Sequence, residues 1–231
     1  MRVGQLVEKI DKANTRVTGR VFAFCFIVIH YSITKKMARN RILLLIAVAE
    51  ELGHKALEQI STRCDVALTG VGKLNAFEAT LLALQKDEYN VIINLGTCGS
   101  SKHSAGSILR PSTIAQGDIY IDSPFATASI NIATGNAEQS ICSSDNFIGA
   151  DTPPSQLQLL EPYDCFDMES YAIIRAIDFY SKRNNRTRPT IEMIKVVSDS
   201  GDETLEDWST RLENLRATLC NALNDVLALY E

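Results

Sequence analysis

The sequence predicts a three-layer α/β/α domain built on a central, mostly parallel mixed sheet. Three observations support this fold class. Strand-like and helix-like segments alternate from Arg41 onward, the first strand segment is apolar throughout, and the last helix segment carries one apolar stripe. Alternation of this kind places helices on both faces of a parallel sheet and buries its strands.

The first half of the chain follows this alternation closely. Residues 42–48 form a continuous apolar run, which is typical of a strand buried on both faces. A helix is expected over 51–60, a second strand over 66–69 and a second helix over 73–85. The next strand, at 91–95, runs directly into a glycine-rich segment.

The second half has shorter elements. Residues 119–121 and 139–142 are candidates for short strands. A helix with one buried face is indicated by residues that recur every four positions, namely Met168, Ala172, Ala176 and Tyr180. A late strand is expected over 191–197, interrupted by the polar residues Glu192 and Lys195. The final helix has the clearest stripe, formed by Trp208, Leu212, Leu215, Leu219, Leu223, Val226 and Tyr230.

The composition predicts one globular domain and argues against several partners. The 231 residues are 45% hydrophobic and 22% charged, which suffices for one full core. The net charge of −5, without clustered Lys and Arg, argues against a nucleic-acid partner. The six cysteines form no C-x-x-C pair, and no histidine lies near them at ligand spacing. We therefore expect free thiols in a reducing cytoplasm, without a metal site or a cofactor.

The N-terminal segment reads differently from the rest. Residues 21–29 are apolar and follow several basic residues, but no small-residue cleavage site comes after them. The run is also shorter than the roughly 20 apolar residues that span a bilayer, so no membrane association is expected. Since residues 37–42 read like a start before the first strand, we expect 1–36 to be an appendage to a single domain over 37–231.

Three acids lie where such a fold binds ligands, beyond the carboxyl ends of its strands. Glu51 follows the first strand, Glu169 opens a helix and Asp199 follows the late strand. Each has a structural alternative, because Glu51 and Glu169 suit the positive end of a helix dipole and Asp199 could cap a turn. All three together at strand ends favour a functional site.

The glycine-rich segment at 96–100 could expose backbone N–H groups to a ligand. It lacks the spacing of a dinucleotide-binding fingerprint and of a phosphate-binding Walker loop. Cys98 lies within it, but no histidine is placed in the sequence to activate it as a nucleophile.

Five motifs occur in an order that resembles the nucleoside phosphorylase superfamily, and most closely its methylthioadenosine/S-adenosylhomocysteine nucleosidase branch. They are residues 69–76 (TGVGKLNA), 94–99 (NLGTCG), 145–148 (DNFI), 167–170 (DMES) and 198–199 (SD). The resemblance extends from Arg41 to the C-terminus. The Met-Glu-Ser and Ser-Asp elements are characteristic of the superfamily and much less of one substrate.

The resemblance implies a role for each acid. Asp199 would protonate a purine at N7, oriented by Ser198, and burial would give it the raised pKa that a donor near neutral pH needs. Glu169 would accept hydrogen bonds from the ribose hydroxyls, with Met168 packed on the sugar. An anionic acceptor also favours a sugar that gains positive charge in the transition state.

Further residues would complete the pocket by the same resemblance. Phe147 would stack on the base and Ile148 would lie beside it, although Phe147 could equally be a core residue. The remaining candidates for substrate contact are Thr97, Cys98, Gly99 and Asp167.

Glu51 distinguishes hydrolysis from phosphorolysis. By the same resemblance, it corresponds to the family's carboxylate that activates water, whereas related phosphorylases carry a Gly-Asp-Pro, arginine-bearing loop after the first strand. Residues 47–51 (AVAEE) contain no arginine. Two adjacent carboxylates would repel a phosphate dianion, so the sequence favours hydrolysis of an adenine nucleoside.

Three departures leave the substrate less defined than the reaction. The segment at 121–141 is shorter than in typical nucleosidases, Lys195 replaces an arginine, and Cys98-Gly99-Ser100 replaces Ala-Gly-Gly. Two alternatives therefore stay open. One is a purine nucleoside phosphorylase with Lys195 and the Thr97 loop as phosphate ligands, and the other is a sensor that binds a nucleoside without cleaving it. The expected partners are a small nucleoside and a second copy of the chain, most simply in a homodimer.

Overall fold

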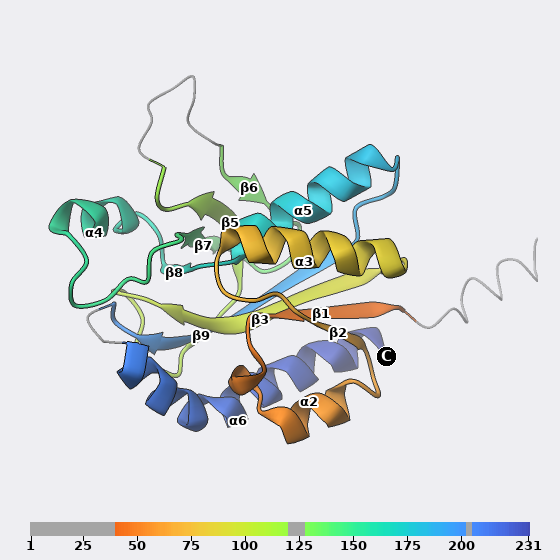
Figure 1. The fold of residues 1–231 in the computed structure, drawn as a ribbon, viewed down its shortest axis with the longest axis horizontal. Coiled ribbons are helices and arrows are strands. Elements are labelled where there is room, and N and C mark those ends of the chain that lie inside the picture. Colours follow the sequence, from red (N-terminus) through yellow and green to blue (C-terminus); the bar gives the residue numbers. More distant parts are fainter. Residues whose placement is uncertain (1–39, 120–127, 202–204) are drawn as a thin grey trace, which may run out of the picture. The chain divides into compact units, whose positions relative to one another are not determined.

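A mixed, mostly parallel sheet forms the centre of the fold (Figure 1). The computed structural model describes residues 40–119, 128–201 and 205–231, with the backbone alone at 205–207. The predicted appendage over 1–36 and its boundary at Met37 lie outside these residues. The described part contains nine strands: β1 (Ile42–Ile46), β2 (Asp65–Leu68), β3 (Val91–Gly99), β4 (Ile108–Leu109), β5 (Pro111–Gln116), β6 (Ile130–Asn131), β7 (Asn136–Ser143), β8 (Cys165–Asp167) and β9 (Thr190–Asp199).

Parallel pairs dominate the sheet. β1 pairs in parallel with both β2 and β3, and β3 pairs in parallel with β9. β7 pairs in parallel with β5 and with β8. Antiparallel pairs join β3 to β8, β4 to β9 and β5 to β6.

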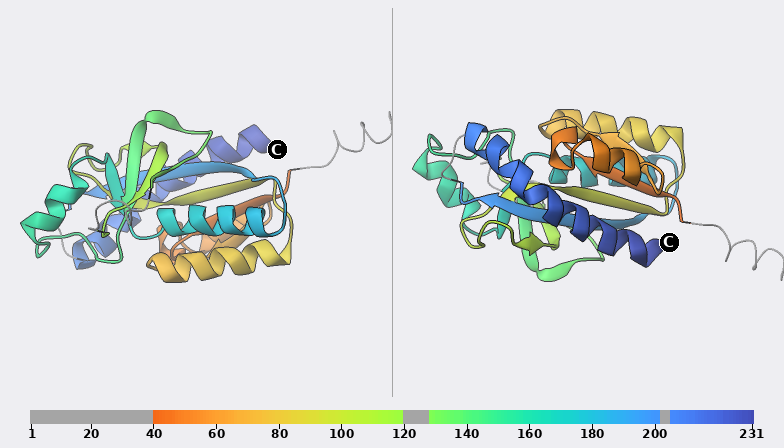
Figure 2. Two further views of the ribbon diagram at one scale, coloured as in Figure 1. Left: turned by 90° about the horizontal axis from the view of Figure 1, so that it is seen from above. Right: turned by 90° about the horizontal axis from the view of Figure 1, so that it is seen from below.

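Helices cover both faces of this sheet. The helical segments are η1 (Ala49–Glu51), α2 (His54–Ile60), α3 (Lys73–Lys86), α4 (Pro154–Leu160), α5 (Ser170–Arg183) and α6 (Leu205–Tyr230). α3 and α5 lie on one face, whereas α2 and α6 lie on the other (Figure 2).

The side chains of β1 show how each face is filled. Leu43 and Leu45 pack in one core cluster with residues of α3 and α5, whereas Leu44 and Ile46 pack with residues of α2 and α6. Successive side chains of a strand point to opposite faces, so an entirely apolar strand supplies both cores. The predicted three-layer class is confirmed.

Two predicted elements differ in detail. The helix expected over 51–60 is divided into η1 and α2 by Gly53, whose φ of 77° lies in the left-handed region. The late strand β9 is continuous through both of its polar residues. Lys195 is paired with Asp167, and Glu192 accepts a hydrogen bond of 2.5 Å from the Tyr230 hydroxyl, so neither charge is left alone in the core.

Several short elements are absent from the sequence-based prediction: β4, β5, β6, β8 and α4. The candidate strand at 119–121 is not a strand at Ile119, and its other residues lie outside the described range. The predicted helix from Met168 begins at Ser170, with Glu169 in the position before its first turn.

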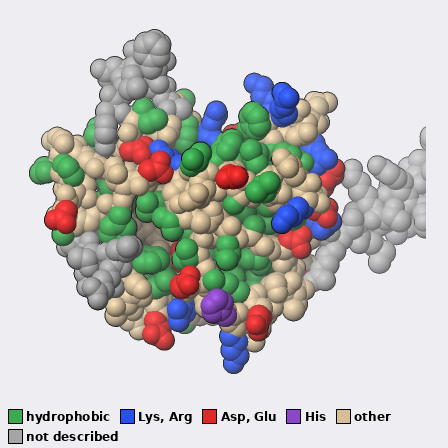
Figure 3. Space-filling view, in the orientation of Figure 1, with side chains coloured by type: hydrophobic (Ala, Val, Ile, Leu, Met, Phe, Trp, Pro, Cys, Tyr) green, Lys and Arg blue, Asp and Glu red, His purple; other side chains and the backbone are tan. Residues whose placement is uncertain are grey.

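Hydrophobic side chains remain on the outer face of α3 and α5 (Figure 3). Leu74 is 80% exposed and Leu82 is 52% exposed on α3, and Phe179 of α5 is 52% exposed. The Phe179 ring lies 6.2 Å from that of Phe77, which extends this surface between the two helices. Among the described helices, none is long and apolar enough to cross a membrane.

The strand directions determine where polar groups can meet. Because β1, β3 and β9 are parallel, their carboxyl ends lie at the same edge of the sheet. Glu51 follows β1, Thr97 lies near the end of β3, and Ser198 and Asp199 end β9. Ligands of open α/β sheets bind at this edge.

Candidate functional site

One pocket at this edge contains every predicted site residue. The space within it is about 680 Å³ with its open mouth included. The predicted residues that line it are Glu51, Thr97, Cys98, Gly99, Phe147, Ile148, Asp167, Met168, Glu169, Ser198 and Asp199. The structure thus brings together side chains that are up to 148 positions apart in the sequence.

Glu51 is held in the short turn η1 and has only 3% of its surface exposed. Its Oε1 accepts hydrogen bonds from the Thr97 backbone N–H at 2.7 Å and from the Thr97 hydroxyl at 3.3 Å. Its Oε2 is buried and has no hydrogen-bond partner among the described residues. Burial raises the pKa of Glu51, against the opposing effects of the Thr97 amide and the Lys195 ammonium.

Asp199 ends β9 and is also buried. Its Oδ2 accepts a hydrogen bond of 2.6 Å from the Ser198 hydroxyl, and its Oδ1 accepts one of 2.9 Å from the Gly201 backbone N–H. The Ser198 hydroxyl also lies 3.2 Å from the Cys98 carbonyl oxygen, which ties the end of β9 to β3. These contacts fix the orientation of the Asp199 carboxyl group.

Glu169 lies between β8 and α5 and faces the loop before α3. Its Oε1 accepts a hydrogen bond of 2.8 Å from the Gly72 backbone N–H. Burial raises the pKa of Glu169 to about 7, and the negative charge of Asp167 adds to the effect. Near neutral pH the two protonation states of this group are therefore close in free energy.

Asp167 and Lys195 form a buried ion pair behind the pocket. The Lys195 Nζ lies 2.8 Å from the Asp167 Oδ2, and both side chains are 2% exposed. Asp167 also accepts hydrogen bonds from the hydroxyls of Ser143 and Ser170. Burial alone would raise the pKa of Asp167, but the Lys195 ammonium and these hydroxyls outweigh it and hold the pKa below its usual value.

A tight contact explains the glycine at position 99. The Phe166 ring lies directly against Gly99, and a Cβ at this position would overlap that ring. Gly201, with φ of 81°, also lies against this ring. Phe166 also lines the pocket, so the two glycines allow its ring to form part of the wall.

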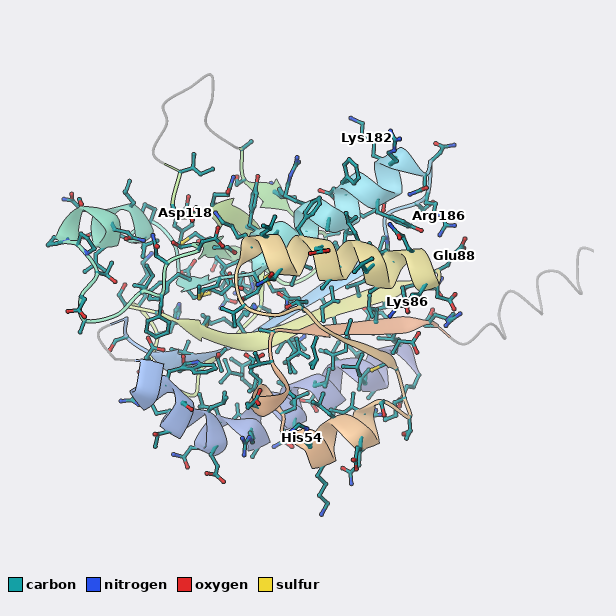
Figure 4. All side chains as sticks on the ribbon, in the orientation of Figure 1. His54, Lys86, Glu88, Asp118, Lys182 and Arg186 are labelled. Carbon is teal, nitrogen blue, oxygen red and sulfur yellow. The ribbon has the colours of Figure 1, made fainter. Side chains whose placement is uncertain are left out.

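The segment with Phe147 and Ile148 is anchored through Asp145. The Asp145 Oδ1 accepts a hydrogen bond of 2.7 Å from the Lys73 backbone N–H at the start of α3. The Asp145 backbone N–H donates to Asp118 Oδ2 at 2.9 Å, and Lys73 Nζ lies 2.5 Å from Asp118 Oδ1 (Asp118 is labelled in Figure 4). Ile148 is buried whereas Phe147 is partly exposed, as expected for a ring that faces an open pocket.

The structure is similar to those of enzymes that cleave nucleosides. The apo form of 5′-methylthioadenosine nucleosidase from Arabidopsis thaliana is 16% identical, with a TM-score of 0.69 over 84% of this chain and 96% of that chain. Futalosine hydrolase from Helicobacter pylori strain 26695 is 15% identical, with a TM-score of 0.65 over 80% and 96% of the two chains.

A third similar structure contains a ligand. It is 5′-methylthioadenosine/S-adenosylhomocysteine nucleosidase from Helicobacter pylori, with one aspartate replaced by asparagine and 5′-methylthioadenosine in its active site. It is 13% identical, with a TM-score of 0.67 over 82% of this chain and 98% of that chain. The chain has the nucleoside phosphorylase-like fold. No protein-family model and no curated protein sequence matches it.

Within this nucleoside phosphorylase-like fold, the pocket also contains residues that were not predicted as site residues. They are Ala47, Val48, Val71, Asn146, Phe166 and Trp208. The sequence predicts Trp208 only as part of the apolar stripe of the last helix. In the structure, its indole N–H donates a hydrogen bond of 3.1 Å to the Thr97 hydroxyl. A polar ring atom in a stripe of leucines was the one sequence signal for this contact.

The pocket is rich in carboxyl groups, but their arrangement is not that of a metal site. No three His, Cys, Asp or Glu side chains within the described ranges are grouped so that they could hold a metal ion. The acids instead have separate partners: Thr97 for Glu51, Gly72 for Glu169, and Ser198 for Asp199. Each is thus held in a different hydrogen-bonding environment within one cavity.

Proposed function

We propose that the protein hydrolyses the N-glycosidic bond of an adenine nucleoside of the 5′-methylthioadenosine/S-adenosylhomocysteine type. The observation that carries the proposal is the meeting of Glu51, Glu169 and Asp199 in one pocket, each with a different environment. The similarity to structures of nucleosidases and of a nucleoside hydrolase supports the same reaction class.

Asp199 is the general acid of the proposed reaction. As the glycosidic bond breaks, electrons flow into the purine, and a proton delivered to N7 neutralises the leaving base. The Ser198 hydroxyl and the Gly201 N–H each occupy one carboxyl oxygen of Asp199, which limits its rotation. Orientation of this kind lowers the entropic cost of reaching the transition state.

Glu169 is the ribose ligand. An ionised Glu169 accepts hydrogen bonds from the 2′ and 3′ hydroxyls and lies beside a sugar that acquires positive charge as the base leaves. The negative charge therefore binds the transition state more strongly than the ground state. Met168, which lines the pocket beside it, supplies an apolar surface for the sugar.

Glu51 is the general base that accepts a proton from water as the water oxygen attacks the anomeric carbon. Its raised pKa brings the group closer to neutrality, where a base is most effective. Phosphate is a poorer fit, because the described pocket lining contains four carboxyl groups and no arginine. Lys195, whose charge acts on Glu51, Asp167 and Glu169, is already paired with Asp167.

We further propose that two copies of the chain associate through the apolar surface of α3 and α5. Leu74, Leu82 and Phe179 together expose a hydrophobic area that a partner of the same composition would bury. A homodimer with this interface places the same surface of both copies in contact. The free cysteines among the described residues are consistent with the reducing cytoplasm expected from the sequence.

The proposed function is tested by adenine release from 5′-methylthioadenosine, S-adenosylhomocysteine, adenosine and inosine. We expect release from the first two substrates with or without phosphate, and its loss in Asp199→Asn. Cleavage only in the presence of phosphate would indicate a phosphorylase instead. Tight binding of the nucleosides without any cleavage would indicate a sensor, and no binding at all would reject the site assignment.

A further inference from the structure

The indole of Trp208 contacts the proposed general base through one intermediate residue. Trp208 lies in the first turns of α6 and is the only tryptophan of the sequence. Its Nε1 lies 3.1 Å from the Thr97 Oγ1, which in turn lies 3.3 Å from the Glu51 Oε1. The three residues come from α6, β3 and η1. The contact therefore joins α6 to the carboxyl end of β3 and to the turn that follows β1.

We propose that Trp208 is a positioning residue that orients the Thr97 hydroxyl toward Glu51 Oε1 and thereby holds the carboxylate of the proposed general base in its ionised form. The proposal rests on the proposed function, since it assigns a positioning residue to the general base of that reaction.

The direction of these hydrogen bonds follows from the donors and acceptors present. An indole N–H can only donate, so the Thr97 oxygen must accept from Trp208. A threonine hydroxyl has a single hydrogen, which is then free to point at Glu51 Oε1. The Thr97 backbone N–H donates to the same oxygen at 2.7 Å, so Oε1 accepts two hydrogen bonds from one residue.

The two carboxyl oxygens of Glu51 are consequently unequal. A proton on Oε1 would have to displace the hydroxyl hydrogen of Thr97, whereas Oε2 has no hydrogen-bond partner among the residues that the structure describes. The Thr97 hydroxyl hydrogen therefore opposes protonation at Oε1. Without the indole donor, the Thr97 hydroxyl could rotate and accept from a protonated Oε1, and this distinction between the oxygens would be lost.

The same contacts stabilise the ionised form of Glu51. Hydrogen bonds donated to a carboxylate lower its pKa, so they oppose the raising effect of burial. The elements near Glu51 carry other titratable or charged groups: Lys195 and Asp199 on β9, Asp167 on β8, Glu169 after it, Arg211 and Arg216 on α6, and His54 and Lys55 on α2. A change confined to Trp208 leaves all of these groups in place. A shift in the pH profile then reports on the two hydrogen bonds that link Trp208 through Thr97 to Glu51, which we call the relay.

A double-mutant cycle on kcat tests the relay. Trp208→Phe keeps an aromatic ring but removes the donor, and Thr97→Val removes the hydroxyl at nearly constant volume. We expect each to lower kcat roughly five- to tenfold, about the effect of one lost hydrogen bond, and to move the acidic limb of the pH profile to higher pH.

The double variant should be no slower than Thr97→Val alone. Thr97→Ser should restore the acidic limb relative to Thr97→Val. Additive losses, or an unmoved acidic limb, would show that Trp208 acts only through packing.

A spectroscopic measurement separates this inference from the proposed function. With a single tryptophan, ¹⁵N-labelled protein gives one indole N–H signal. We expect this signal to shift in Glu51→Gln and to follow the titration of Glu51 in the wild type, but not in Thr97→Val. If the signal couples to Glu51 while no nucleoside is cleaved, the proposed function fails and the relay stands. If nucleosides are cleaved while the signal ignores Glu51, the relay is wrong.

Discussion

Glu169 and Asp199 are carboxyl groups of one pocket, and their neighbours give them different properties. Asp199 accepts one hydrogen bond on each oxygen, from Ser198 and from the Gly201 amide. Glu169 accepts one from Gly72, and its pKa is raised to about 7 by burial and by Asp167. Burial, neighbouring charges and hydrogen-bond donors together therefore distinguish the proposed roles.

The raised pKa of Glu169 predicts a pH-dependent affinity. Ribose hydroxyls donate to the ionised carboxylate, so binding favours the deprotonated form and must displace a proton below pH 7. The affinity for a non-hydrolysable adenine nucleoside analogue should therefore rise from pH 5.5 to pH 8, as measured by isothermal titration calorimetry. Glu169→Gln, which cannot ionise, should bind weakly and without this dependence. An affinity that is constant with pH in the wild type would contradict the assignment.

Lys195 is predicted to be essential for stability as well as for charge balance. Lys195→Met leaves Asp167 buried without its counter-ion, and loss of one partner of a buried pair costs about 3–5 kcal/mol. Urea unfolding measures the change. A matched control is Arg186→Met, which breaks an exposed pair with Glu88 (both labelled in Figure 4) and should change the free energy of unfolding far less. Equal losses in the free energy of unfolding for the two variants would mean that the buried pair contributes no more to stability than the exposed pair.

At the scale of elements, the close approach of β3 and β8 depends on Gly99. A Cβ there would overlap the Phe166 ring, so Gly99→Ala should displace the ring and distort the pocket wall. We expect lower thermal stability and at least a tenfold loss of nucleoside affinity. Phe166→Leu combined with Gly99→Ala should recover part of both, because the smaller side chain leaves room. Failure of this rescue would mean that the overlap with Phe166 is not the cause.

The elements differ in how well the sequence predicts them. β1 and α6 have long regular patterns, since β1 is apolar at every position and α6 is amphipathic over seven turns, and both are found close to the predicted residues. β8 has three residues and β4 has two, which is too short for any periodicity. α4 has seven residues, which is too short for an apolar stripe to identify it as a helix.

The candidate site follows a similar rule. Motifs at strand ends that resemble a known superfamily predict eleven site residues, and these residues line one pocket. Trp208 is not predicted as a site residue, because it belongs to no strand-end motif and its apolar ring fits the stripe of the last helix. Phe166 likewise reaches the pocket only through its contacts with Gly99 and Gly201, which no spacing in the sequence indicates.

For the whole molecule, the apolar surface of α3 and α5 predicts a homodimer. Leu74→Glu places a charge on this surface and should yield a monomer of 25.5 kDa in sedimentation velocity. Leu229→Glu is the matched control, because Leu229 is 72% exposed on α6, on the other face of the sheet, and should leave the dimer intact. A monomeric wild type, or equal disruption by both variants, would reject the interface.

The proposed hydrolysis of the N-glycosidic bond is tested most directly by the identity of the sugar product. This product, formed from 5′-methylthioadenosine, is identified by mass spectrometry with and without inorganic phosphate. We expect adenine and free 5-methylthioribose at equal rates in both conditions, with Glu51→Gln and Asp199→Asn each nearly inactive. A sugar 1-phosphate that forms only when phosphate is present, or release of adenine that is unaffected by both substitutions, would contradict it.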